Sequence, residues 1–276
     1  MRARLRELAA YREILINLVR KELKVKYTAS VLGTIWSLLN PVVFLAVFWF
    51  VSKILRGGVQ DYPVFLLSGL LAWNLFSVAI SSGAQSVIVN ANLVKKVYFP
   101  REILPLAAVG VALVDFVLQS AVFFALLLVF TYGFALDFLW LYPLAFVALI
   151  VLGTGIAFLV SALNVRYRDV QHLIGLGLIV WFWLTPIVYA PGTVADVLVE
   201  RSQVYWNLYL PNPVAWVVMG FQGALYHSPD AAEVLAPISD RGLAAGLGTV
   251  ILLGMLFLYL TWRLYFTRSG DFAEEL

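Results

Sequence analysis

Residues 90–105 read NANLVKKVYFPREILP and form a short basic segment between two long apolar runs. The runs at residues 64–84 and 103–132 are each long enough to cross the hydrocarbon core of a bilayer as a helix. Basic connections between such spans are retained on the cytoplasmic side of a membrane. The segment therefore predicts an inner loop of a polytopic membrane protein, and its charges favour docking of a soluble, charged partner.

The composition of the whole chain agrees with this interpretation. Of the 276 residues, 62% are hydrophobic and 13% are charged, whereas soluble domains average about a quarter charged residues. The apolar runs are continuous, unlike the short alternating segments of a transmembrane β-barrel. The absence of cysteine excludes disulfides, thiol nucleophiles and thiolate metal sites, and two histidines far apart in sequence give little basis for a metal cluster.

Six apolar runs are expected to cross the membrane as helices. They lie at residues 32–55, 62–83, 103–132, 141–163, 173–189 and 243–265. With both chain ends inside, 15 of the 19 lysines and arginines fall in inner segments and four in outer segments, as the positive-inside rule requires. The predicted fold class is an all-α polytopic membrane protein with six transmembrane helices and cytoplasmic termini.

The N-terminal segment, residues 1–28, is basic and amphipathic. Apolar side chains recur at helical spacing on one side, at Ile14, Leu15, Leu18, Val19 and Val25. Charged residues on the other side include Arg20, Lys21 and Lys24. We expect an interface helix in the headgroup plane that also grips a partner, and a plain topogenic anchor in contact with anionic lipid is the alternative. The chain then divides into this helix (1–28) and a transmembrane domain (29–276).

The first inner loop combines charge with aromatic side chains. Lys95, Lys96 and Arg101 flank Tyr98 and Phe99. Loops of this composition suit docking into a cleft on a soluble subunit. Ordinary retention of positive charge on the inner side is the alternative, but it needs only the lysines and arginines and not the aromatic residues.

A second basic segment, residues 164–172, reads NVRYRDVQH and follows the fourth expected span. Arg166, Arg168 and Asp169 give it the same charged character as the first loop. Asn164 is expected to cap or break the end of the preceding helix. This segment is predicted to be a second inner docking loop.

Two further features depart from simple spans. Residues 213–226 (PVAWVVMGFQGALY) lie in the long outer region 190–241 and are too short to span, as is typical of re-entrant or interfacial helices. Asp115 lies deep in the third span, where a carboxylate is a functional candidate by default. With no second buried acid, base or histidine nearby in sequence, we favour a structural hydrogen bond from Gln119, one turn further on, or across a subunit contact.

Aromatic residues make up 15% of the chain, and part of this content lies deep in the expected spans. Aromatic faces can stack on sugar rings and tolerate sliding. As a group, these residues are predicted to line a path for a glycan, and packing or lipid contact is the alternative for each of them. The candidate lining residues are Phe44, Phe48, Phe65, Trp73, Phe76 and Trp181. Small residues in the fourth span, including Gly155 and Ala157, are expected to allow close helix approach.

Missing motifs exclude several kinds of chemistry. No G-x-x-x-x-G-K-[ST] phosphate loop, H-E-x-x-H or G-x-S-x-G sequence occurs in the chain. Intramembrane charges suited to an ion relay are nearly lacking, which disfavours an ion-coupled transporter. If the protein moves a substrate, we expect the energy to come from a separate subunit.

The chain resembles the ABC-2 type permeases of polysaccharide exporters, the group of Wzm-like O-antigen and TarG-like teichoic-acid permeases. The resemblance covers nearly the whole chain. It rests on RKELKVKYTASVLGTIWSLLNP (20–41), FLLSGLLAW (65–73), NANLVKKVYFPREILP (90–105), NVRYRDV (164–170), TPIVY (185–189) and NPV (212–214). Each motif is weak by itself, and together they are fairly specific.

The resemblance implies a non-catalytic homodimer of six-span subunits in the bacterial inner membrane, paired with two ATP-binding subunits. It implies an interface helix at residues 5–27, re-entrant outer helices between the fifth and sixth spans, and a lipid-linked glycan as substrate. ATP and magnesium would be bound by the partner, and this chain would hold no cofactor. The residues expected to couple to the ATPase are Asn92, Lys95, Lys96, Tyr98, Phe99, Arg101, Arg166, Arg168 and Asp169.

Three other functions remain in view at this point. One is an ABC-2 exporter of drugs or simple lipids, which the aromatic content and the motifs disfavour. Another is an intramembrane glycosyl- or acyltransferase, which would need acids, bases or histidines clustered near one membrane face. The third is a purely structural assembly protein, which the long outer region makes less natural.

Overall fold

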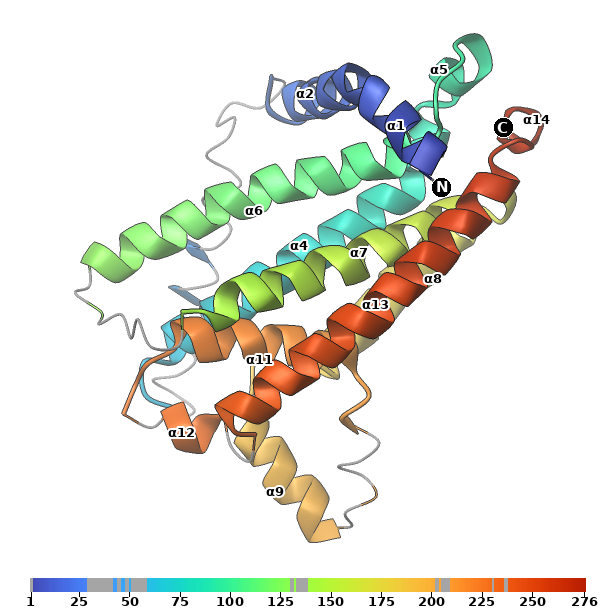
Figure 1. The fold of residues 1–276 in the computed structure, drawn as a ribbon. Coiled ribbons are helices and arrows are strands. Elements are labelled where there is room, and N and C mark those ends of the chain that lie inside the picture. Colours follow the sequence, from blue (N-terminus) through green and yellow to red (C-terminus); the bar gives the residue numbers. More distant parts are fainter. Residues whose placement is uncertain are drawn as a thin grey trace.

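The computed structural model describes residues 2–28, 59–129, 132, 139–201, 204, 209–229, 231–235 and 238–276, with Val42, Val43, Ala46, Val47 and Phe50. The expected first span (32–55) lies almost wholly outside these residues, as do Phe44 and Phe48. The described residues hold helices and no strand, as the sequence predicts (Figure 1).

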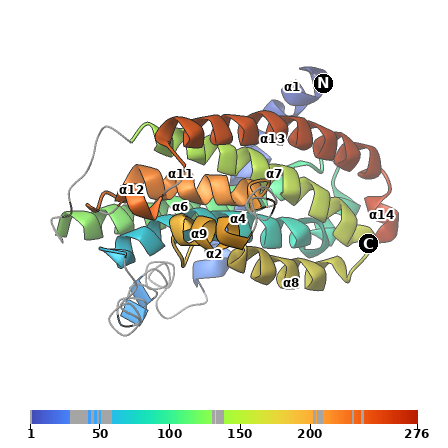
Figure 2. The same ribbon diagram turned by 90° about the horizontal axis from the view of Figure 1, so that it is seen from below.

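Four described helices are long and apolar enough to cross a membrane: α4 (Tyr62–Val89), α6 (Ile103–Val129), α7 (Leu141–Arg166) and α13 (Asp240–Arg268). They confirm the second, third, fourth and sixth expected spans. Their apolar side chains form one core together with the short helix α11 (Pro213–Leu225). Seen from below, α13 and α8 (Val170–Trp183) lie on opposite sides of α4 and α7 (Figure 2).

Close contacts between α7 and its neighbours depend on small residues. A Cβ atom on Gly83 of α4 would lie 2.8 Å from the Cβ of Ala157, so the two backbones meet there. On another side of α7, a Cβ atom on Gly155 would lie 2.9 Å from the ring of Phe257 in α13. The prediction that small residues of the fourth span allow close approach is therefore confirmed.

The fifth expected span, residues 173–189, differs from the prediction. Helix α8 has 14 residues and ends at Trp183, so it is about 21 Å long, less than the roughly 30 Å of a hydrocarbon core. Pro186 cannot continue a helix, because it has no N–H to donate. The free carbonyl of Leu184 accepts a hydrogen bond from Asn212 Nδ2 at 3.1 Å instead. Apolar composition alone did not reveal this early end.

Helix α11 is linked to the end of α8 through Asn212, the residue before its first turn. It packs against α4, α7 and α13, and nearly all of its residues are buried. Asn212 caps its first turn by accepting a hydrogen bond from the backbone N–H of Val214 at 3.2 Å. Inside the helix, Gln222 Nε2 donates to the carbonyl of Pro186 at 2.8 Å. The TPIVY and NPV motifs, which are separate in sequence, are therefore held together by hydrogen bonds. We name this contact the joint between α8 and α11.

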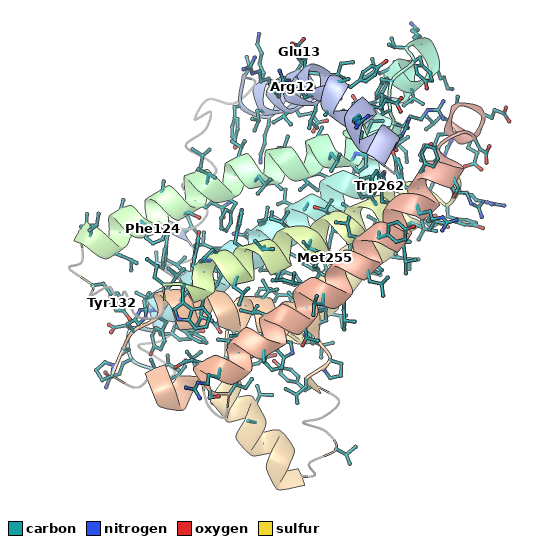
Figure 3. The ribbon with its side chains drawn as sticks, in the orientation of Figure 1. Arg12, Glu13, Phe124, Tyr132, Met255 and Trp262 are labelled. Carbon is teal, nitrogen blue, oxygen red and sulfur yellow. The ribbon has the colours of Figure 1, made fainter. Side chains whose placement is uncertain are left out.

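The remaining helices are short or lie at the two ends of the bundle. They are α1 (Arg2–Ala10), α2 (Arg12–Thr28), α5 (Ala91–Lys96), α9 (Pro191–Arg201), α12 (Ala231–Val234) and α14 (Phe272–Glu275). Both chain termini lie at the same end as α1, α5 and α14, and α9 and α12 lie at the opposite end (Figure 1). Side chains fill the space between the long helices (Figure 3).

The contact between α11 and α13 can be tested at a glycine. A Cβ atom on Gly246 would lie 2.1 Å from the Trp216 ring, whereas one on Gly248 would meet nothing within 4 Å. We expect Gly246→Ala to lower the free energy of unfolding by about 1–3 kcal/mol through overpacking. Gly248→Ala is the matched control and should stabilise slightly, because glycine weakens a helix. Thermal unfolding in detergent checks this, and equal stabilities of the two variants would contradict the packing described.

Candidate functional site

One end of the bundle brings together the segments that the sequence marks as docking loops. It carries α1, α5, α14 and the connection between α7 and α8 (Figure 1). We name it the terminal end, because both chain termini lie there. The first loop comprises α5 and residues 97–102, and the second loop comprises residues 166–169.

The first loop separates its predicted docking residues into two groups. Asn92, Lys95 and Lys96 are exposed, and Tyr98 is 81% exposed. Phe99 is instead buried. The exposed cations and the tyrosine are therefore available to a partner, whereas Phe99 anchors the loop to the bundle.

The second loop is shorter than the sequence indicates. Helix α7 continues to Arg166, and Arg166, Arg168 and Asp169 are all exposed. The expectation that Asn164 caps or breaks the helix was wrong. This residue is completely buried, and its Nδ2 donates to the carbonyl of Ala84 in α4 at 2.8 Å. A buried amide needs a partner, and Asn164 finds one across the α4–α7 contact.

A second hydrophobic core lies beneath both loops. We name it the terminal cluster, and it joins α2, α4, α5, α6, α7, α13 and α14. Its buried members are Leu18, Val87, Val94, Phe99, Ile103, Leu104, Ala107, Phe158, Ala162, Val165, Tyr265 and Phe272. Both loops therefore rest on one packed unit, although they are far apart in sequence.

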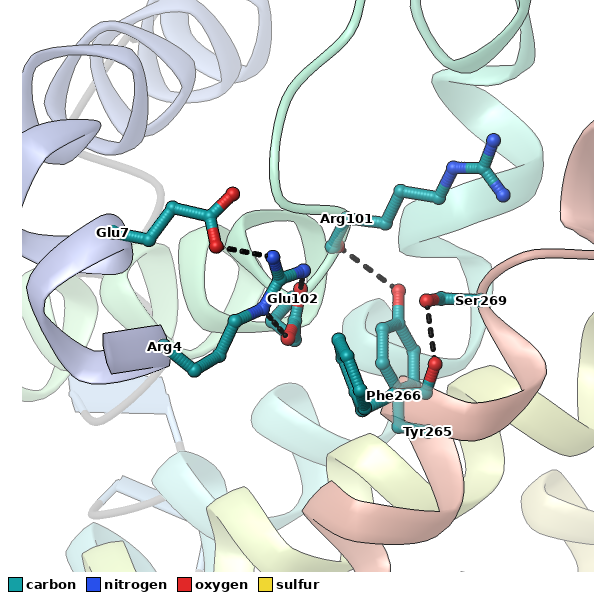
Figure 4. Close-up of polar contacts among 7 residues, drawn as sticks. All are labelled: Arg4, Glu7, Arg101, Glu102, Tyr265, Phe266 and Ser269. Carbon is teal, nitrogen blue, oxygen red and sulfur yellow. Dashed lines mark hydrogen bonds and ion pairs between the residues drawn. The ribbon is translucent and has the colours of Figure 1, made fainter. Parts of the chain in front are cut away.

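A buried ion pair attaches the N-terminus to the first loop (Figure 4). The Arg4 guanidinium donates two hydrogen bonds to Glu102, at 2.9 and 2.8 Å, and the Glu102 side chain is 0% exposed. The same guanidinium binds Glu7 and lies 4.7 Å from the ring centroid of Phe266 in α13. The hydrogen bond with Glu102 raises the pKa of Arg4 above its ordinary value, which favours the charged guanidinium.

The expected interface helix is two helices, α1 and α2, with a turn at Tyr11. The turn lets Arg4 reach Glu102 while α2 packs along α6. Ile14, Leu15, Leu18 and Val19 pack on the terminal cluster as predicted.

The opposite side of α2 is less uniform than the periodicity indicates. Val25 lies two turns beyond Leu18 on the same side but is 68% exposed, so no described part of the subunit covers the apolar side there. Arg20 and Lys24 are exposed, and the exposed Arg12 and Glu13 lie on α2 near its start (Figure 3). Lys21 Nζ instead donates to Asn90 Oδ1 at 3.1 Å, which links α2 to the start of the first loop.

Asp115 has a structural partner, but not the one expected. Its carboxylate accepts a hydrogen bond from Lys26 Nζ at 2.6 Å and another from the Tyr27 hydroxyl. Gln119 instead accepts from Asn74 Nδ2 of α4 at 3.0 Å. The carboxylate deep in the third span therefore holds the end of α2 against α6.

The described aromatic residues proposed to line a path pack against other aromatic rings within the subunit. Ring centroids of Trp73 and Phe182 lie 5.4 Å apart, and those of Phe76 and Trp181 lie 5.2 Å apart, both edge to face. Phe65 and Phe76 are completely buried. The lining role stays a prediction, and for these two residues it requires α4 to separate from the helices that cover it.

Trp181 has a polar partner in addition to its ring contact. Its Nε1 donates to Asn212 Oδ1 at 2.9 Å, so it belongs to the joint between α8 and α11. The periodicity of the fifth span could not reveal this bond, because Asn212 lies 31 positions away in sequence.

Several residues that build the terminal end were missed from the sequence. Arg4 and Glu102 were not singled out, and neither were Tyr265 and Phe272. The one available signal was Glu102 itself, a lone acid between the basic loop and a long apolar run. Such an acid favours a helix N-terminus, but nothing in the sequence marks it as buried.

The long apolar helices define a multi-pass membrane protein whose charged loops share one end with its termini. Residues 14–226 match the family description "ABC-2 type transporter". The chain therefore belongs to the ABC-2 type transporter family, and the resemblance drawn from its motifs is confirmed.

Named relatives are similar over much or all of the chain. The O-antigen export system permease protein RfbA of Myxococcus xanthus is 30% identical over 278 residues, which cover 98% of each chain. The RfbA protein of Klebsiella pneumoniae is 31% identical over 211 residues, 76% of this chain and 79% of that protein. The polysialic acid transport protein KpsM of Escherichia coli is 23% identical over 207 residues, 72% of this chain and 75% of KpsM.

The Arg4–Glu102 pair gives a direct test of the terminal end. Removing one partner of a buried ion pair leaves an uncompensated charge, which costs about 3–5 kcal/mol. We expect Arg4→Ala to destabilise the protein by this order and Arg6→Ala, at an exposed position, to have little effect. The double replacement Arg4→Leu with Glu102→Leu should recover much of the loss. Thermal unfolding measures the stability of all three variants, and similar stabilities of the Arg4 and Arg6 variants would contradict the role given to the Arg4–Glu102 ion pair.

The Asp115 contact predicts an asymmetry between its two partners. The Lys26 side chain is 45% exposed and can be solvated alone, whereas the Asp115 side chain is 5% exposed and cannot. Lys26→Met should therefore cost more stability than Asp115→Asn, by about 1–3 kcal/mol. Lys24→Met is the matched control at an exposed lysine. The opposite order in unfolding experiments would rule out this assignment.

Proposed function

We propose that the chain is the permease subunit of an ATP-binding cassette exporter that moves a lipid-linked cell-surface polysaccharide, such as an O-antigen, across the plasma membrane. The similarity to the Myxococcus xanthus O-antigen export permease over 98% of each chain is the observation that carries this proposal. The similarity to KpsM supports a polysaccharide as the wider class of substrate.

Energy comes from ATP hydrolysis in a separate subunit. The chain has no phosphate loop, so ATP and its magnesium ion belong to the partner, and this subunit contributes no catalytic residue or cofactor. Two copies of the permease pair with two copies of the ATPase. This follows the closed two-fold symmetry that most oligomers adopt, with one motor for each permease.

The ATPase docks at the terminal end. Both loops present exposed charges there, and Tyr98 adds an exposed aromatic ring. Aromatic residues and arginine are enriched in protein–protein interfaces, and Tyr98, Arg166 and Arg168 are exposed here. The terminal cluster supports both loops, and α2 adds Arg20 and Lys24 on its exposed side.

This docking site fixes the orientation in the membrane. The terminal end faces the cytoplasm of a bacterial cell, and α9 and α12 face outward. The chain crosses six times, with the largely buried segment 185–190 completing the crossing that the short helix α8 begins, and α11 is a re-entrant helix that enters from the outer side. Burial of α11 among α4, α7 and α13 supports this, because a short lipid-exposed helix would leave its ends unsatisfied.

The function is tested by reconstitution. The permease and its ATP-binding subunit, placed together in liposomes, should move an undecaprenyl-linked polysaccharide in an ATP-dependent manner. Permease alone should hydrolyse no ATP. Transport of small amphipathic drugs or phospholipids, with no movement of the glycan, would contradict the proposal.

Charge reversal tests the docking site. We expect Lys95→Glu combined with Lys96→Glu to weaken ATPase binding about tenfold, because each exposed ion pair contributes up to 1 kcal/mol and reversal adds repulsion. Arg241→Glu is the matched control, since it reverses an exposed charge at the start of α13. Arg101 is left unchanged, because its side chain donates to the carbonyl of Gly270.

Binding is measured by co-purification and titration, and topology by protease accessibility of the chain termini. Inverted topology in the double variant would show that the lysines serve only to orient the spans. Unchanged binding with normal topology would place the ATPase elsewhere.

A further inference from the structure

The C-terminal segment returns to the terminal end after α13 and lies against both loops. Helix α14 contacts α5 of the first loop and the end of α7, which leads into the second. Phe272 of α14 is 1% exposed. Helix α14 has only four residues, so the burial of Phe272 depends on contacts with other elements.

Three aromatic rings that pack edge to face supply part of these contacts. Tyr265 of α13 packs edge to face against Phe158 of α7, with ring centroids 5.3 Å apart. Its other neighbour is Phe272, at 5.2 Å and again edge to face. These three rings therefore join α7, α13 and α14 at the level of the two loops.

Two hydrogen bonds at Arg101 tie the same segment to the first loop. The Tyr265 hydroxyl donates to the backbone carbonyl of Arg101 at 3.0 Å (Figure 4). The Arg101 guanidinium donates to the carbonyl of Gly270 at 3.2 Å. Because Tyr265 is completely buried, moving the loop away would break a buried hydrogen bond at a cost.

We propose that residues 269–276 form a strut that fixes the first loop relative to the second loop. The strut lies outside residues 14–226, the part of the chain that matches the family description. Tyr265 and Phe272 are positioning residues, because neither is exposed to a partner. If the ATPase docks on the loops as proposed above, the strut makes the two loops move as one body when the ATPase displaces either of them.

The chain itself allows a measurement that needs no ATPase. The chain has no cysteine, so a cysteine can be introduced at each of the exposed positions Lys96 and Arg168, and each of the two carries one spin label. The full-length labelled protein is placed in lipid nanodiscs with excess unlabelled chain, so that distances within one subunit dominate. Pulsed dipolar spectroscopy then gives the distribution of distances between the two loops.

We expect a narrow distribution in the parent chain and a clearly broader one in Phe272→Ala. Phe272→Leu keeps apolar bulk, so its distance distribution should stay narrow. Glu274→Ala, at an exposed position of α14, should have the same distribution as the parent chain. Tyr265→Phe keeps the ring but loses the hydrogen bond to Arg101, so it should broaden the distribution less. An unchanged distribution in Phe272→Ala overturns the strut.

The same variants are then assayed in the complex with the ATPase. Phe272→Ala should bind the ATPase yet export less polysaccharide for each ATP hydrolysed, and Phe272→Leu should restore the ratio. If the distribution broadens but the ratio stays the same, the strut is correct and the coupling role proposed for the loops is wrong.

Discussion

Glu102 sets the main constraint on this structure, because its carboxylate is completely buried at the start of α6. A charge in that position must be paired and hydrogen-bonded, or the site does not form. Arg4 meets the requirement with two hydrogen bonds, and this brings the N-terminus onto the first loop. Its contact with the ring of Phe266 adds α13 to the same point. One ion pair thus connects segments from both ends of the chain.

The two largest hydrophobic clusters of the described residues differ in what surrounds them. The larger core lies between α4, α6, α7, α11 and α13 and has the composition of a membrane domain. The terminal cluster is smaller, and it supports exposed loops instead of lipid-facing helices. Helices α4, α6, α7 and α13 run through both regions and connect them directly. Lys26 and Asp115 add a connection of the same kind between α2 and α6.

Much of this fold could be predicted from the sequence, because a long continuous apolar run crosses a membrane as a helix, which satisfies its own backbone hydrogen bonds. The four long helices and the two basic loops follow from hydropathy and charge. The partners of individual side chains could not be predicted. Arg4 and Glu102 are 98 positions apart, and Lys26 and Asp115 are 89 apart, so no local pattern connects them. Val25 and Trp183 show the same limit, because periodicity and apolar content report neither the neighbours of a helix nor where it ends.

We propose that the ATP-binding subunit docks at the terminal end. Site-specific photo-crosslinking in intact cells tests it most directly. A photo-reactive residue replaces Lys96, Arg168 or Arg241, one position at a time, and crosslinks to the ATP-binding subunit are scored. We expect crosslinks from positions 96 and 168 and none from position 241. Crosslinks from position 241 alone would contradict it.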